Sequence, residues 1–171
     1  MTRVLISLVE IARMRRDPSE LPPSIVLFAL LAVANVGSNM LQSWLLHEND
    51  HLLARSVADL GLTIAMFWFV LAVTRRLYRY RQTMNAVLGV SVLLTPLLLI
   101  LIGLQQPAQV YYPIKLVAWA GWIGVIVWYT LIIGHILRSA LEVGFVTSIA
   151  IAITTVIAGS AVLGKLFPVA A

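Results

Sequence analysis

His47 and His51 stand four residues apart in a short polar segment between two apolar stretches. On a helix this spacing puts both imidazoles on one face, as in many pairs of metal ligands. Asn49 and Asp50 lie between them, and both residue types form turns and cap helices well. No third residue that could bind a metal follows at the spacing of a known metal site. We therefore predict a solvated loop over residues 47–55, with no metal and no cofactor. Metal binding, or chemistry on lipid headgroups by His47, Asp50 and His51, is the less favoured alternative.

A stripe of amides and hydroxyls follows one face of the first long apolar segment. Its members recur at i, i+3, i+4 and i+7 and are Asn35, Ser38, Asn39, Gln42 and Ser43. Polar groups are costly in lipid, so such residues are candidates for function. They could line a polar path or a ligand cleft, or they could hydrogen-bond to neighbouring helices, each bond contributing about 0.6–2 kcal/mol. We favour the packing role for this stripe.

Asp59 is the acidic residue that falls clearly inside a predicted membrane span. Arg55 precedes it by one helical turn, so an i, i+4 pair would neutralise both charges. A proton-coupled site needs a titratable carboxylate in such a place, but an acid beside an arginine is more often structural. Antiparallel packing of the first two spans would also bring Asp59 near Gln42. We name Asn35, Asn39, Gln42 and Asp59 as the candidate intramembrane polar site.

Four arginines alternate with tyrosines between two later apolar segments, and they are Arg75, Arg76, Arg79 and Arg81. Such a cluster anchors membrane topology and attracts anionic lipids at the cytoplasmic face, which is the interpretation we favour. Docking of a partner protein is the alternative. We expect no nucleic-acid binding, because the loop is short and held at both ends by membrane spans. The chain also has no Gly-rich phosphate loop, HExxH or GxSxG motif, so we predict no catalytic residues and no enzyme.

Composition places all of these residues in a membrane protein. Of 171 residues, 61% are hydrophobic and 11% are charged, and the mean hydropathy is +0.96. A soluble domain is about 45–50% apolar and about 25% charged, so a soluble globular enzyme and a disordered chain are both excluded. The absence of cysteine excludes disulfides and thiolate metal sites. We attribute the net charge of +5 to topology and lipid contact.

The elements that position these residues follow from hydrophobic periodicity and length. Residues 1–16 predict an amphipathic interfacial helix, and residues 17–24 a Pro-rich linker. The five-helix transmembrane domain covers residues 25–167, with spans at 25–46, 57–74, 86–104, 114–137 and 143–167. A span of this length crosses a hydrocarbon core of about 30 Å. The predicted fold class is all-α, a polytopic membrane bundle of five transmembrane helices preceded by an N-terminal interfacial helix.

Charge asymmetry predicts the orientation of the bundle. Nine lysines and arginines fall on the side of the N-terminal segment, and three fall on the other side. The positive-inside rule then places the N-terminus in the cytoplasm and the C-terminus in the periplasm, as a multi-pass inner-membrane protein.

Small residues on the last two spans predict close helix packing. Ala120 and Gly124 form a small-xxx-small pair, and Gly144 and Gly159 help to keep one side of the final helix thin. Small residues let helix backbones approach, so these spans are expected to pack as a hairpin or against a partner. Across the short turn between them, Arg138 and Glu142 are spaced to form an ion pair.

The layout resembles the Yip-domain family, small five-span proteins named for interacting with Ypt/Rab GTPases in eukaryotes. Residues 128–142 (WYTLIIGHILRSALE) carry the best local likeness, because the family commonly has a Trp in its fourth span followed by a short turn with a small residue and Ala. Residues 11–30, an interfacial helix followed by a Pro-containing start of the first span, are also similar. The long cytoplasmic tail of eukaryotic members is absent. For a small bacterial-type member the resemblance implies the fold, no defined activity and no catalytic residues.

Together these features predict a non-enzymatic scaffold, or an accessory subunit of a bacterial envelope membrane complex. Its expected partners are the bilayer, anionic lipids at the cytoplasmic face, and another membrane protein or a second copy of the chain. The alternative is a small permease or channel component with a polar path along Asn35, Asn39, Gln42 and Asp59.

Overall fold

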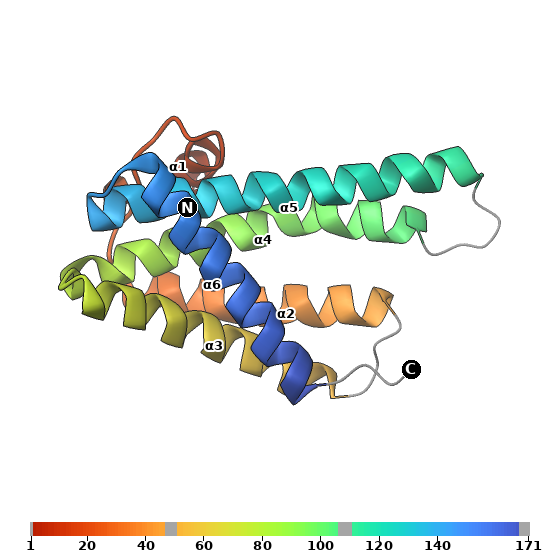
Figure 1. Ribbon diagram of the computed structural model, residues 1–171, viewed down its shortest axis with the longest axis horizontal. Helices are drawn as coiled ribbons and strands as arrows, with labels where there is room; N and C mark the ends of the chain where they lie inside the picture. Colours follow the sequence, from red (N-terminus) through yellow and green to blue (C-terminus); the bar gives the residue numbers. More distant parts are fainter. Residues whose placement is uncertain (1, 47–50, 106–110, 168–171) are drawn as a thin grey trace.

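The computed structural model of the chain describes residues 2–46, 51–105 and 111–167, which contain helices and no strands (Figure 1). The elements in order are α1 (Thr2–Ala12), η1 (Pro18–Glu20), α2 (Ile25–Leu45), α3 (Leu52–Val73), η2 (Leu77–Arg79), α4 (Tyr80–Gln105), α5 (Tyr112–Leu141) and α6 (Phe145–Leu166). The helices α2 to α6 are each long and apolar enough to cross a membrane. The predicted all-α fold class with five membrane-crossing helices is confirmed.

Helix α4 is the centre of the bundle. It packs extensively on both α2 and α5, whereas α3 packs mainly on α2, and α6 packs mainly on α5. In Figure 1, α2, α4 and α5 run along the long axis, and α6 crosses them obliquely. All eight residues from Thr83 to Val90 of α4 are buried. A helix that is covered on every side is the expected core element of such a bundle.

The tightest apolar core lies at the end of the bundle that α1 covers. Side chains less than 2% exposed come here from α3, α4 and α5, and they include Leu71, Met84, Leu88, Ile132 and Ile136. In lipid, close packing of this kind holds helices together, because the acyl chains outside are as apolar as the core. This end of the bundle is therefore closed by side chains.

The N-terminal helix joins the bundle by one face. Leu8, Ile11 and Ala12 are buried against α4 and α5, and the indole Nε1 of Trp128 donates to the carbonyl oxygen of Ala12 at 3.1 Å. The helix ends at Ala12, before the last residues of the segment predicted as interfacial, 1–16. Its apolar residues serve in part as core, while Leu5, for example, stays exposed.

The linker between α1 and α2 follows the same end of α4 and α5. Asn85 Nδ2 of α4 donates to the carbonyl oxygens of Pro22 at 3.1 Å and Ser24 at 3.3 Å, and the hydroxyl of Ser139 in α5 donates to Asp17. Partial burial acts to raise the pKa of Asp17, but hydrogen bonds from Ser139 and Ser19 outweigh it and lower the pKa below its ordinary value. The linker is thus fixed to the bundle by side chains of α4 and α5.

His135 also contacts this linker. Its Nε2 lies 3.2 Å from the carbonyl oxygen of Arg16, so it faces the N-terminal segment.

Three helices extend beyond the apolar segments that predicted them. Helix α3 begins at Leu52 where the predicted span begins at residue 57, so the prediction of a loop over 47–55 is wrong from Leu52 onward. The reason is that Leu52, Leu53 and Ala54 are good helix formers and continue the helix beyond the apolar segment. Helix α4 begins at Tyr80 where the predicted span begins at residue 86, and α5 covers Tyr112–Leu141 where the predicted span covers 114–137. The extra turn of α4 contains Thr83 and Asn85, whose side chains donate to carbonyl oxygens of Arg79 and the linker. Partners supplied by the fold therefore let polar residues continue the helix.

We expect Gly89→Val to weaken the docking of α1 on α4. A Cβ at position 89 would lie 2.5 Å from Leu8 Cδ2, and overpacking of this kind costs about 1–3 kcal/mol. Gly103→Val in the same helix is the matched control, because a Cβ there meets nothing within 4 Å. The free energy of unfolding in nanodiscs and protease cleavage near Arg13 are the measurements. Equal losses for the two variants would contradict this contact.

Candidate functional site

A chain of polar side chains links three helices in the half of the bundle away from α1. Asn35 of α2 donates to the hydroxyl of Ser91 in α4 at 3.0 Å. Asn39 donates to the Oδ1 of Asn35 at 3.4 Å and to Oδ2 of Asp59 in α3 at 2.8 Å. The amides of the predicted stripe thus act between helices, as polar residues in membrane bundles commonly do.

One end of this chain opens into a polar cavity of about 220 Å³ between α2, α3 and α6. Its lining residues are Asn39, Gln42, Ser43, Leu46, Arg55, Ser56, Asp59 and Leu163. Three of the four predicted site residues therefore meet at one cavity. The fourth, Asn35, is buried. It lies next to Asn39 in the series of hydrogen bonds and donates to Ser91.

Asp59 is the acidic group of this cavity. The hydrogen bond from Asn39 is the one bond its side chain makes with the described residues, and Arg55, one turn earlier, attracts the carboxylate electrostatically. A carboxylate can accept about four hydrogen bonds. The side chain therefore keeps acceptor capacity that the described protein groups leave unused.

Ser56 and Ser91 belong to the site although the sequence pattern did not single them out. Ser56 is 2% exposed, and its hydroxyl has no hydrogen-bond partner among the described residues. Its position three residues before Asp59 puts both on one helix face. This spacing could have identified Ser56 as a site residue from the sequence. Ser91 carried no such signal, because its partner Asn35 is brought to it by tertiary packing of α2 on α4.

Glu142 forms ion pairs with two of the four arginines of the basic cluster. The Nη2 of Arg76 lies 2.6 Å from Oε2 of Glu142, and the Nη2 of Arg79 lies 2.7 Å from Oε1. Arg79 also donates to the carbonyl oxygen of Ser139 at 2.6 Å. The two arginines thereby join the turn between α3 and α4 to the turn between α5 and α6.

The other two arginines of the cluster, Arg75 and Arg81, make no side-chain hydrogen bond or ion pair with the described residues. They remain the members of the cluster that can meet lipid headgroups or a partner. Glu142 pairs with Arg76 and Arg79 instead of with Arg138, which was its predicted partner.

Close approach of α5 and α6 occurs at Gly134. A Cβ there would lie 2.9 Å from Ile149 Cγ1 and 3.3 Å from its Cα. The hairpin expectation for Ala120 and Gly124 is wrong at these positions, since Ala120 is exposed and a Cβ at Gly124 would meet nothing within 4 Å. Ala120 and Gly124 remain candidates for contact with a partner.

The other two predicted packing glycines lie in different surroundings. A Cβ at Gly159 would lie 3.6 Å from Met66 Sδ, so this glycine of α6 faces α3. Gly144 is the N-cap of α6 and has open space around it apart from Thr147 Oγ1 at 4.0 Å.

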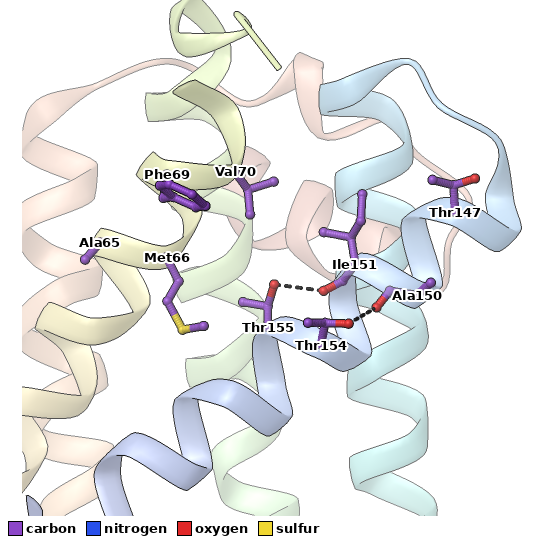
Figure 2. A pocket seen from close by; sticks show the side chains of 9 residues that line it. All are labelled: Ala65, Met66, Phe69, Val70, Thr147, Ala150, Ile151, Thr154 and Thr155. Atoms are coloured by element: carbon purple, nitrogen blue, oxygen red, sulfur yellow. Dashed lines mark hydrogen bonds between the residues drawn. The ribbon is translucent and has the colours of Figure 1, made fainter. Parts of the chain in front are cut away.

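A second, apolar groove of about 520 Å³ lies between α3 and α6 (Figure 2). Its lining residues are Ala65, Met66, Phe69 and Val70 from α3, and Thr147, Ala150, Ile151, Thr154 and Thr155 from α6. The hydroxyls of Thr154 and Thr155 donate to the carbonyl oxygens of Ala150 and Ile151 in their own helix, at 2.9 and 2.8 Å. The threonine hydroxyls are therefore already hydrogen-bonded, and the threonines contribute methyl groups to the groove.

The histidine pair is described in part. His47 lies outside the described residues, and His51 is the exposed N-cap of α3 with a left-handed backbone, φ 58°. Among the described residues no group of three or more His, Cys, Asp or Glu side chains could hold a metal ion. The histidine pair as a metal site stays the less favoured alternative.

Comparison of the chain with protein-family models, with curated proteins and with solved structures gave no match. The likeness to the Yip-domain family stays a prediction.

We expect the link through Glu142 to weaken on acidification. The hydrogen bond and charge of Arg76, with those of Arg79, lower the pKa of Glu142 below its ordinary value of 4.5. The stabilisation is therefore present above pH 4.5 and is lost as pH falls through the lowered pKa. Glu142→Gln is expected to lower Tm at pH 7, and the difference from wild type is expected to vanish at low pH. Thermal unfolding in nanodiscs from pH 7 to pH 3 measures the Tm of both proteins. A Tm difference between them that does not change with pH would contradict the ion pair.

Proposed function

We propose that this protein is a non-enzymatic scaffold or accessory subunit of a bacterial inner-membrane complex. The observation that carries the proposal is the groove between α3 and α6, which the chain's own side chains leave unfilled. The partner we propose there is a transmembrane helix of another membrane protein or of a second copy.

The lining of the groove supports this choice. Small residues such as Ala65 and Ala150 allow a helix backbone to come close, and close packing is what drives helix association in lipid. Because the threonine hydroxyls are bonded within α6, a partner helix needs no polar group to match them. Phe69 is largely exposed beside the groove and offers a large contact surface.

The orientation is part of the proposal. The excess of lysine and arginine on the N-terminal side favours a cytoplasmic N-terminus and a periplasmic C-terminus. Arg75 and Arg81 would then meet anionic lipids at the cytoplasmic face. A small member of the Yip-domain family would have the same five-span layout.

We expect Ala150→Phe to abolish partner association by filling the groove. Ala161→Phe is the matched control, because Ala161 is also exposed on α6 but does not line the groove. Native mass spectrometry of the tagged protein, extracted with its lipids, measures the stoichiometric partner or second copy. Retention of that component by Ala150→Phe would contradict the groove as the interface.

A small permease or channel component is the second candidate. The chain from Asp59 through Asn39 and Asn35 to Ser91 favours it, because it reaches from the cavity into the middle of the bundle. Beyond Ser91 the apolar core around Met84 closes the path. Transport would therefore require the α1 end of the bundle to open.

For this candidate we expect Asp59→Asn and Gln42→Leu to abolish flux while the protein stays folded. Proteoliposomes with fluorescent reporters of H⁺, Na⁺ and K⁺ measure the flux, and Ser38→Ala is the control on the same face of α2. Wild-type flux no greater than that of protein-free liposomes, or unchanged flux in both variants, would remove the candidate.

A further inference from the structure

The polar cavity between α2, α3 and α6 has no role in the proposed scaffold function. Its volume is about 220 Å³, which is room for a small organic group. Ser56 and Asp59 are the fifth and eighth residues of α3, so they lie about 6–10 Å from the start of the helix. The predicted membrane span begins at residue 57, so both residues lie near its start, where we expect lipid headgroups to meet the hydrocarbon region.

The cavity presents acceptors that the protein leaves unused. Asp59 receives one hydrogen bond, from Asn39, and the buried hydroxyl of Ser56 has no partner among the described residues. The side chains of Gln42 and Ser43 also make no hydrogen bond with the described residues. Of this set Ser56 is buried, whereas Gln42, Ser43 and Asp59 are partly exposed at the cavity. A buried polar group without a partner, such as the Ser56 hydroxyl, is rare in folded proteins and calls for an explanation. A ligand rich in hydrogen-bond donors would satisfy this set.

We propose that the cavity binds a primary ammonium group that is carried beside an acidic group on a small zwitterion. A primary ammonium has three N–H donors and a positive charge, which match the Asp59 carboxylate and the neutral oxygens around it. Leu46 and Leu163 also line the cavity and would contact the methylenes next to the amine. The positive charge of Arg55 in the same lining favours a ligand that carries an acidic group beside the amine over a bare amine.

A dehydrated metal ion fits this cavity less well. Protein oxygens that hold such an ion converge to about 2.3–2.6 Å from it, whereas this cavity is wide and has apolar walls. Two sources of the ammonium zwitterion remain, the headgroup of phosphatidylethanolamine and a free molecule such as O-phosphoethanolamine.

The test compares two lipids that share the phosphate group and differ in whether the ammonium carries N–H donors or methyl groups. Full-length protein in nanodiscs that contain equal phosphatidylethanolamine and phosphatidylcholine is examined by native mass spectrometry for retained lipid. Phosphatidylcholine has the same phosphate but a quaternary ammonium without N–H. For a lipid ligand we expect about a tenfold preference for phosphatidylethanolamine, the size that charge-assisted hydrogen bonds provide.

The second arm tests the free zwitterion. In nanodiscs of phosphatidylcholine alone, millimolar O-phosphoethanolamine is expected to raise Tm if the ligand is a free molecule, and phosphocholine is expected to leave Tm unchanged. A lipid preference without this shift assigns the headgroup, and the shift without a lipid preference assigns the free molecule. Neither effect in wild type would overturn the proposal.

Variants then assign the effect to the cavity. Asp59→Asn is expected to remove the preference or the shift, and Ser56→Ala to reduce it, whereas Ser38→Ala, outside the cavity lining, is expected to leave it unchanged. If Asp59→Asn does not fold, Ser56→Ala against Ser38→Ala still decides the assignment. A full effect in Ser56→Ala and in any folded Asp59→Asn would overturn it. The inference is independent of the scaffold proposal, because loss of a partner in Ala150→Phe leaves this cavity intact.

Discussion

The constraint on which this structure depends is that a polar group within a membrane must find its partner inside the protein. Asn39 illustrates the consequence, since its amide bonds both to Asn35 in its own helix and to Asp59 in the next. Asn35 in turn bonds to Ser91 of the central helix. Three helices are thereby held in one register by a few side chains, in a setting where apolar burial gives little preference between protein and lipid.

The same constraint explains the N-terminal segment. Carbonyl oxygens of Ala12, Arg16 and Pro22 lie outside the long helices, and side chains of α4 and α5 supply their partners. This docking covers the buried half of α4 and closes one end of the bundle. The other end keeps a polar cavity with unused acceptors, so the two ends of the molecule differ in chemistry as well as in charge.

The sequence predicted the parts of the site that are local along the chain. The spacing of Asn39 and Gln42 put them on one face of a helix, and the short connection to α3 brought Asp59 to the same end. Ser91 and Gly134 escaped prediction for the same reason. Ser91 acquires its role only when α2 packs on α4, and Gly134 only when α5 packs on α6.

What the sequence determined by itself is the five-span helical architecture, because span length and apolar composition are set by the thickness of the bilayer. It also determined which polar residues lie within the long apolar helices. The tertiary structure alone decided which of them meet. Glu142 pairs with Arg76 and Arg79 rather than with Arg138, and Ser56 faces a cavity. The physical reason is that helix faces alike in apolar character can pack in many ways in lipid, and the arrangement that satisfies the polar groups is a property of the whole bundle.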